Sequence, residues 1–244
     1  MVSMSAPRYT NEELMASVMA RLLRGLRHVA VGALSPLPAT AALLAGALDP
    51  SLRVTILGAR AHQCFTDGGR ELFDCAAQGR IDAFFLSGVQ IDGNANINLV
   101  GLGDYAHPVR RFPGSFGSAY LYHLIPKVIL FRQEHTPRIF VPKVDFISAA
   151  GTSPAHEYRP GGPRHLVTGR AEFAFAEGRF QLVSVHGDET GASVRAATGF
   201  DFLSPETVPM TPAPSAAELV ALRGYARTQV QEIYPAFAAH AFGG

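Results

Sequence analysis

Residues 28–57 of this chain, HVAVGALSPLPATAALLAGALDPSLRVTIL, decide its fold class. The short apolar run His28–Gly32 ends in glycine and predicts a buried strand, and Val54–Leu57 predicts a second strand. Between them, Leu34-Ser35-Pro36 opens a predicted helix that runs through Leu48, because proline is favoured in a first helical turn. Two strands joined by a helix form a parallel pair with a right-handed crossover.

The flanking segments extend this pattern. Apolar residues at helical spacing predict a helix over 12–26, with Thr10 or Asn11 as N-cap, and another over 69–78. Further strands are predicted at 82–87, 128–131 and 138–140, a loop at 152–165, and strands near 172–175 and 180–185. We therefore expect an α/β fold, with an open, mostly parallel sheet, flanking helices and a β-rich C-terminal part.

The end of the sequence is rich in proline. Residues 204–215 contain four prolines, which indicates an extended segment that wraps over the protein. Ser215 and Glu218 have the spacing of a capping box and predict the start of a terminal helix. We expect one domain over 1–244, in which 204–244 form the wrapping segment and this helix.

Composition excludes several classes of protein. Hydrophobic residues make up 48% of the 244 residues and charged residues only 17%, which favours a large core and an interface with another chain. The net charge of +1 gives no reason to expect nucleic acid or an anionic membrane as partner. Cys64 and Cys75 are too few for a disulfide scaffold or a zinc site. Residues 1–10 do not form a secretory signal, and prolines interrupt the apolar run 29–48, so a cytoplasmic protein without a membrane span is expected.

Four segments then carry a resemblance to a known family. They are Gln90-Ile91-Asp92 with Asn96-x-Asn98; Gly103-Asp104-Tyr105 with Pro108 and Arg111–Ser115; Phe140-Val141 with Lys143–Ile147; and Thr198-Gly199-Phe200 with the helix over 212–223. In this order and spacing they resemble the B subunit of glutaconate CoA-transferase, a class I CoA-transferase. Relatives of that subunit include ring-opening CoA hydrolases of steroid degradation and a myxobacterial decarboxylase.

The resemblance implies a fold, a substrate and a partner. It implies the CoA-transferase fold, an acyl-CoA thioester as substrate, and a bacterial heteromer with an A subunit, as a heterotetramer or larger. Coenzyme A would enter only as part of the substrate, without any bound cofactor or metal. The glycine-rich loop 113–119 would lie near the thioester carbonyl, with Gly114, Ser115, Phe116 and Gly117 in contact with substrate. An ordinary tight turn before a helix is the alternative for this loop, and Phe116-Gly117 replaces a pair of glycines common in the family.

The family's nucleophile is missing. True transferases of this class use a glutamate that follows the second strand, and here Gly58-Ala59-Arg60-Ala61-His62 follow it. No carboxylate occurs before Asp67, and Glu12, Glu13 and Glu71 lie in predicted helices. Because glycine and alanine cannot act as nucleophiles, this argues against simple CoA transfer.

Other residues could take a catalytic or binding role in place of the missing glutamate. Arg60 could pair with a substrate carboxylate and His62 could transfer protons, although a surface arginine and a loop histidine are equal alternatives. For Cys64, a buried and inert side chain is favoured over a nucleophile. Asn96, Asn98 and Asp92 either bind substrate or fix their own turn, and the turn is favoured. Asp104 could line the cleft or an interface, and Ala95 disfavours an unusual backbone angle at its position.

Three functions follow from this sequence. The first is the B subunit of an acyl-CoA-processing enzyme that works by hydrolysis, carbon–carbon bond opening or decarboxylation, with Arg60 and His62 as candidate catalytic residues. The second is a genuine CoA-transferase, of glutaconate or 3-oxoacid type, whose carboxylate comes from elsewhere. The third is a catalytically silent structural subunit.

Overall fold

The computed structural model describes residues 9–242, and its centre is a seven-stranded sheet in the order β11-β10-β9-β8-β3-β1-β2. Five of these strands form a parallel set: β1 (His28–Val31), β2 (Arg53–Ile56), β3 (Ala83–Leu86), β8 (Lys127–Arg132) and β9 (Pro163–Thr168). The remaining two, β10 (Ala171–Ala176) and β11 (Arg179–Val185), add an antiparallel hairpin at one edge. The α/β fold with a mostly parallel sheet is confirmed.

Helices cover both faces of the sheet because side chains along each strand alternate between two cores. Val29 and Val31 of β1 pack in the core formed with α1 (Asn11–Arg21) and α2 (Pro36–Leu48). Ala30 of the same strand packs in the opposite core, with α3 (Gly68–Ala77) and α4 (Ser118–Leu124). The helix α1 ends five residues before the predicted position 26, and Gly25, with φ of 75°, lies in the turn that follows.

Two small hairpins lie between β3 and α4. One pairs β4 (Gln90–Ile91) with β5 (Ile97–Asn98), and the other pairs β6 (Gly101–Leu102) with β7 (Arg110–Arg111). In the first, Asp92 Oδ1 accepts hydrogen bonds from the amides of Asn94 and Asn96, so Asp92 fixes its own turn. The expectation for Ala95 was wrong, since its φ is +57°, and its carbonyl accepts a 2.7 Å hydrogen bond from the Tyr122 hydroxyl.

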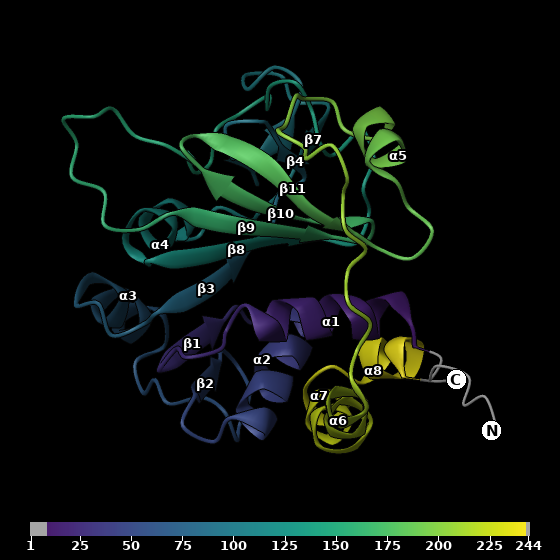
Figure 1. Ribbon diagram of the computed structural model, residues 1–244. Coiled ribbons are helices and arrows are strands. Elements are labelled where there is room, and N and C mark those ends of the chain that lie inside the picture. Colours follow the sequence, from purple (N-terminus) through teal and green to yellow (C-terminus); the bar gives the residue numbers. More distant parts are fainter. Residues whose placement is uncertain (1–8, 243–244) are drawn as a thin grey trace, which may run out of the picture.

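The C-terminal segment wraps over the protein as an extended chain. After α5 (Gly191–Ala196), it runs beside β11, where Leu182 N–H donates to the Leu203 carbonyl and Val185 N–H to the Pro209 carbonyl. Figure 1 shows it passing from α5 down along α1 to the helices at the C-terminal end. The capping box of Ser215 and Glu218 is present. A series of helices follows instead of one: α6 (Ala216–Ala221), η1 (Leu222–Ala226), α7 (Arg227–Ile233) and α8 (Pro235–Ala241).

Two local predictions were wrong. Residues 138–140 do not form a strand: Ile139 N–H closes a turn onto the Thr136 carbonyl, and Phe140 makes a single bridge to Ile91. The strand β9 begins at Pro163, inside the predicted loop 152–165, because it pairs with β8 despite its proline-rich start. Within residues 9–242, no helix is long and apolar enough to cross a membrane.

Candidate active site

A cavity of about 440 Å³ lies at the carboxyl ends of the central parallel strands. Open α/β sheets place their ligands at this edge. One side of the cavity is formed by residues that follow or end the strands: the loop Gly32–Ser35 after β1, Leu57 after β2, and Leu86 and Ser87 at the end of β3. The other side is formed by Leu99, Gly114, Phe116 and Ser118. The lining is completed by five apolar residues: Leu72, Phe84, Phe85, Leu121 and Phe131. None of these lining residues carries an ionisable side chain.

The predicted substrate loop 113–119 forms part of this wall, as Gly114 and Phe116 line the cavity. The amide of Gly114 donates to the Leu99 carbonyl, and that of Ser118 donates to the Ser115 carbonyl. The amides of Ser115, Phe116 and Gly117 have no acceptor among residues 9–242. Backbone N–H groups without an acceptor are the donors that an oxyanion requires.

Gly117 is fixed by its contact with α3. Its φ of 60° is left-handed, and a Cβ at this position would collide with the ring of Phe73. The neighbouring Phe116 packs against the same ring, with centroids 5.4 Å apart, although its own side chain is 75% exposed. The glycine therefore lets the loop lie against α3, and Phe116 occupies the rim of the cavity.

Asn96 and Asn98 do not line the cavity. Both build a network of hydrogen bonds that ties the first hairpin to residues 143–151. Asn98 Nδ2 donates to Gln90 Oε1 at 2.8 Å and to the Gly101 carbonyl at 2.7 Å, while Asn96 donates to Asp92 and accepts from the Gly151 amide. The first and third resembling segments also meet, because Gln90 Nε2 donates to Asp145 Oδ2 at 3.0 Å and the Asp145 amide donates to Gln90 Oε1 at 2.9 Å.

Asp104 also lies outside the cavity. Its carboxylate accepts hydrogen bonds from the amides of Ala106 and His107, at 2.8 and 3.2 Å, and so closes its own turn. The next residue, Tyr105, is 57% exposed and stacks on Phe146 with centroids 4.8 Å apart. Asp104 and Tyr105 are exposed and are not among the residues that line the cavity.

Arg60, His62 and Cys64, which follow Leu57 in the sequence, do not line the cavity. Arg60 is exposed, and His62 is half-buried, with its Nε2 2.9 Å from Gln229 Oε1 on α7. The expectation of a buried Cys64 was wrong: the residue is exposed, and its Sγ lies 3.1 Å from Thr55 Oγ1. The structure does not bring these three side chains together with the loop 113–119 in one cavity.

Two contacts hold the loops of the site to the C-terminal helices. The Tyr234 hydroxyl donates to the Ala33 carbonyl at 2.8 Å, in the loop that follows β1. The second contact is that of His62 with Gln229, in the loop that follows β2. The sequence predicted neither contact, because no local pattern shows that residues 201 or 167 positions apart meet.

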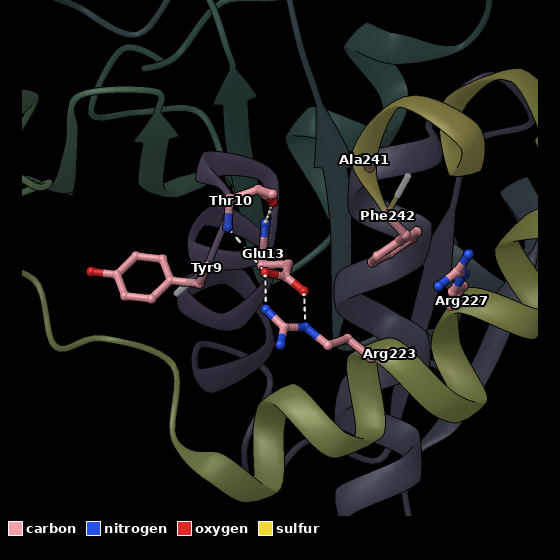
Figure 2. A pocket seen from close by; sticks show the side chains of 7 residues that line it. All are labelled: Tyr9, Thr10, Glu13, Arg223, Arg227, Ala241 and Phe242. Carbon is pink, nitrogen blue, oxygen red and sulfur yellow. Dashed lines mark hydrogen bonds and ion pairs between the residues drawn. The ribbon is translucent and has the colours of Figure 1, made fainter. Parts of the chain in front are cut away.

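The glutamates of the first hundred residues lie elsewhere. Glu71 is in α3, and Glu12 and Glu13 are in α1, as predicted. Figure 2 shows Glu13 in a separate cavity of about 500 Å³, beside the terminal helices. Burial raises the pKa of Glu13, but Arg223, with contacts of 2.7 and 2.9 Å, and the Thr10 amide outweigh burial and hold the pKa below its usual value. This carboxylate is an ion-pair partner of the terminal helices.

The chemistry that this chain brings to the cavity comes from neutral groups. Among residues 9–242, no three His, Cys, Asp or Glu side chains gather in a way that could hold a metal ion. What the cavity offers from this chain is an apolar surface, three serine hydroxyls and the backbone amides of the loop 113–119.

Solved structures define the class of this fold. The chain superimposes on glutaconate coenzyme A-transferase from Acidaminococcus fermentans with a TM-score of 0.79, at 25% identity, over 91% of this chain and 96% of that one. Its TM-score with IpdAB from Rhodococcus jostii is also 0.79, at 25% identity, over 89% and 94%. With the decarboxylase AibA/AibB it is 0.78, at 22% identity, over 97% and 100%. The protein therefore has the CoA-transferase fold.

Sequence comparisons agree with this fold. The family model described as Coenzyme A transferase matches residues 55–157. The B subunit of 3-oxoadipate CoA-transferase from Pseudomonas knackmussii is 36% identical over 154 residues, which span 59% of this chain and 58% of that protein. The B subunit of glutaconate CoA-transferase from A. fermentans is 30% identical over 146 residues, or 56% and 54% of the two chains. In sequence, the chain thus matches little more than half the length of either relative. The chain thus has the CoA-transferase fold, matches the Coenzyme A transferase family over residues 55–157, and is similar to B subunits of class I CoA-transferases.

Proposed function

We propose that this chain is the B subunit of a heteromeric enzyme that processes an acyl-CoA thioester by a reaction other than CoA transfer. One observation carries this proposal: the cavity at the carboxyl edge of the sheet has no carboxylate among its lining residues. Leu57 occupies the position directly after β2, where a nucleophilic glutamate is expected. Covalent catalysis by a glutamate of this chain is therefore not available in the cavity.

The chain can still supply stabilisation of negative charge. An attack on the thioester carbonyl, or loss of a carboxylate or carbon–carbon bond beside it, places negative charge on the carbonyl oxygen. The amides of Ser115, Phe116 and Gly117 lack acceptors among the described residues and stand next to the cavity. Such preorganised donors each contribute on the order of 3 kcal/mol to transition-state stabilisation.

The acid and base must then come from a second chain. Arg60 and His62 remain candidates only if the partner or substrate reaches the outer side of the loop after β2, since neither lines the cavity. An A subunit that closes the cavity would bring ionisable groups to it. The low charge of the chain, 17%, and exposed apolar residues beside the cavity such as Leu34, which is 93% exposed, support such a partner.

The experiment uses the purified complex of this chain with its A subunit. A panel of acyl-CoA thioesters is incubated with and without acetate, and the products are identified by mass spectrometry. We expect free coenzyme A, carbon dioxide or a ring-opened CoA ester without any need for acetate. Formation of acetyl-CoA in proportion to the substrate consumed would contradict the proposal.

CoA transfer remains the second candidate, because both relatives found by sequence are named as transferase subunits. In that case a glutamate of the A subunit would form the acyl anhydride and then the glutamyl thioester. Borohydride or hydroxylamine would trap this thioester, and peptide mass spectrometry would show on which chain it lies. A trapped adduct on the A chain would replace the first proposal with this one.

A further inference from the structure

We infer that the cavity receives an uncharged, apolar acyl group, and that it selects against acyl groups with a second carboxylate. The inference rests on the proposed function and names the class of its substrate. It leaves hydrolysis and carbon–carbon bond opening and excludes decarboxylation, because loss of carbon dioxide needs a second carboxylate on the acyl group. It follows from the side chains of the cavity, from the helix that begins at its edge, and from the few polar groups left within it.

The walls of the cavity are aliphatic and aromatic. Leu57 lies at its sheet side, Leu72 and Phe84 at its base, and Leu99 and Phe116 along the loop side. Phe84 is buried in the core below, and Leu72 is only 2% exposed, so these walls are fixed by packing. A cavity of about 440 Å³ with such walls gains affinity from each methylene group that it removes from water.

A carboxylate in this cavity would find no cation among the lining residues of this chain. None of the lining residues is lysine, arginine or histidine. Arg60, the arginine closest in sequence to Leu57, is exposed and lies outside the lining. An ionised group moved from water into apolar surroundings without a partner is strongly disfavoured.

The helix at the cavity edge does not replace the missing cation. The loop Gly32–Ser35 lines the cavity and leads directly into α2. A helix start normally offers free amides to an anion. Here Pro36 and Pro38 occupy the first and third positions of α2 and have no N–H, so Leu37 alone carries one among these three residues. The helix start is therefore poor in donors for a carboxylate.

The polar groups that remain suit a neutral oxygen. Ser35 makes no capping bond to α2, and Ser118 Oγ already donates to the Ser115 carbonyl at 3.1 Å. With Ser87, these hydroxyls can bind one carbonyl or hydroxyl oxygen of a substrate. These hydroxyls cannot balance a full negative charge, and in the proposed function the amides of the loop 113–119 bind the thioester oxygen.

The test compares two probes of similar size on the complex with the A subunit. Isothermal titration calorimetry measures the Kd of cyclohexanecarboxyl-CoA and of glutaryl-CoA, whose acyl group ends in a carboxylate. We expect cyclohexanecarboxyl-CoA to bind at least roughly 100-fold more tightly, with a negative heat-capacity change from apolar burial. Equal or tighter binding of glutaryl-CoA would overturn the inference and leave the proposed function standing. If neither ester binds an intact complex, the proposed function fails, and the inference with it.

Variants locate the selectivity in the cavity. Phe116→Arg puts a guanidinium at the cavity rim, at an exposed position where the fold tolerates a polar side chain. It should reduce the preference for cyclohexanecarboxyl-CoA by roughly 10-fold or more, through tighter binding of glutaryl-CoA. Leu99→Arg should do the same from a second position on this side of the cavity. Val220→Arg adds the same charge at a position on α6 that is 75% exposed and outside the lining, and should leave the preference unchanged. An unchanged preference in both cavity variants, with thermal unfolding like the parent, would place the selectivity elsewhere and refute the inference.

Discussion

Gly117 and Phe73 are in such close contact that the loop 113–119 cannot accept a Cβ at position 117. Two separate conditions demand glycine here: the left-handed φ of 60° and the ring of Phe73. The loop amides next to the cavity depend on both conditions, because Gly117 is also the residue from which α4 begins.

The substitution Gly117→Ala should therefore lower both stability and turnover. A left-handed φ costs an alanine about 1 kcal/mol, and the collision with Phe73 adds about 2 kcal/mol through displacement of the loop. Urea unfolding measures the loss of stability, and kcat/KM, expected to fall at least roughly 10-fold, measures the effect on turnover.

Gly79→Ala is the matched control for this variant. Its φ is 65°, and nothing lies within 4 Å of an added Cβ, so only the cost of the backbone angle applies. Combining Gly117→Ala with Phe73→Ala should restore part of the lost turnover, as expected for residues in contact. If the two glycine variants lose equal stability and activity, Phe73 does not hold the loop.

Asn98→Ala should destabilise the protein by about 3 kcal/mol. The change leaves the Gln90 side chain and the Gly101 carbonyl without their shared donor in a buried site. Asn94→Ala, an exposed asparagine in the same hairpin with no side-chain hydrogen bond among the described residues, is the control and should change stability by less than about 0.5 kcal/mol. A small effect of both would mean that the network is not structural.

Stability should fall as pH decreases from about 6.5 to 4. Burial lowers the pKa of His135 and His186 from 6.5 to about 4, so both stay neutral in the folded protein while the unfolded chain takes up protons. The stabilisation is complete above the unfolded pKa and is lost as pH falls toward the folded pKa. Each histidine contributes at most about 1.4 kcal/mol per pH unit in this window.

Urea unfolding of His186→Asn at several pH values checks this prediction. The variant should show a shallower decline between pH 6.5 and 4 than the parent protein does. His107→Gln changes an exposed histidine and should keep the parent's slope. Parallel curves for all three proteins would show that the buried histidine is not the group that titrates.

Tyr234→Phe should loosen the loop that follows β1. It removes the hydroxyl that donates to the Ala33 carbonyl and should cost about 1 kcal/mol of stability. Since residues 32–35 line the cavity, kcat/KM should fall several-fold while the unfolding transition stays cooperative. Tyr225→Phe, at a half-exposed tyrosine without a hydrogen bond among the described residues, should match the parent in both measurements.

Much of the fold could be predicted because its signals are local. The pattern at 28–57, the capping box at Ser215 and the run at 128–131 depend on neighbouring residues alone, and the corresponding elements are present. The strand predicted at 138–140 is absent, because the amides of Ile139 and Phe140 close a turn onto the Thr136 carbonyl instead of pairing with a neighbouring strand. The strand β9 was missed because its pairing with β8 outweighs a local composition typical of loops.

The site was only partly predictable. Gly114 and Phe116 line the cavity, and their contact with substrate stays a prediction. Arg60 and His62 were selected as candidates because their side chains are ionisable. The residue after β2 that lines the cavity is Leu57, whose aliphatic side chain gives no indication of a catalytic or binding role. Its place directly after a parallel strand was the available clue. The partners of Asn96 and Asn98 lie up to 55 positions away and could not be derived from spacing.

The hydrogen bond between Tyr234 and Ala33 also imposes an order on biosynthesis. Ala33 is synthesised 201 residues before Tyr234, so the growing chain carries the loop after β1 without this hydrogen bond until Tyr234 has been added. The loop of residues 32–35, which lines the cavity, therefore gains this contact only after α7 has been synthesised.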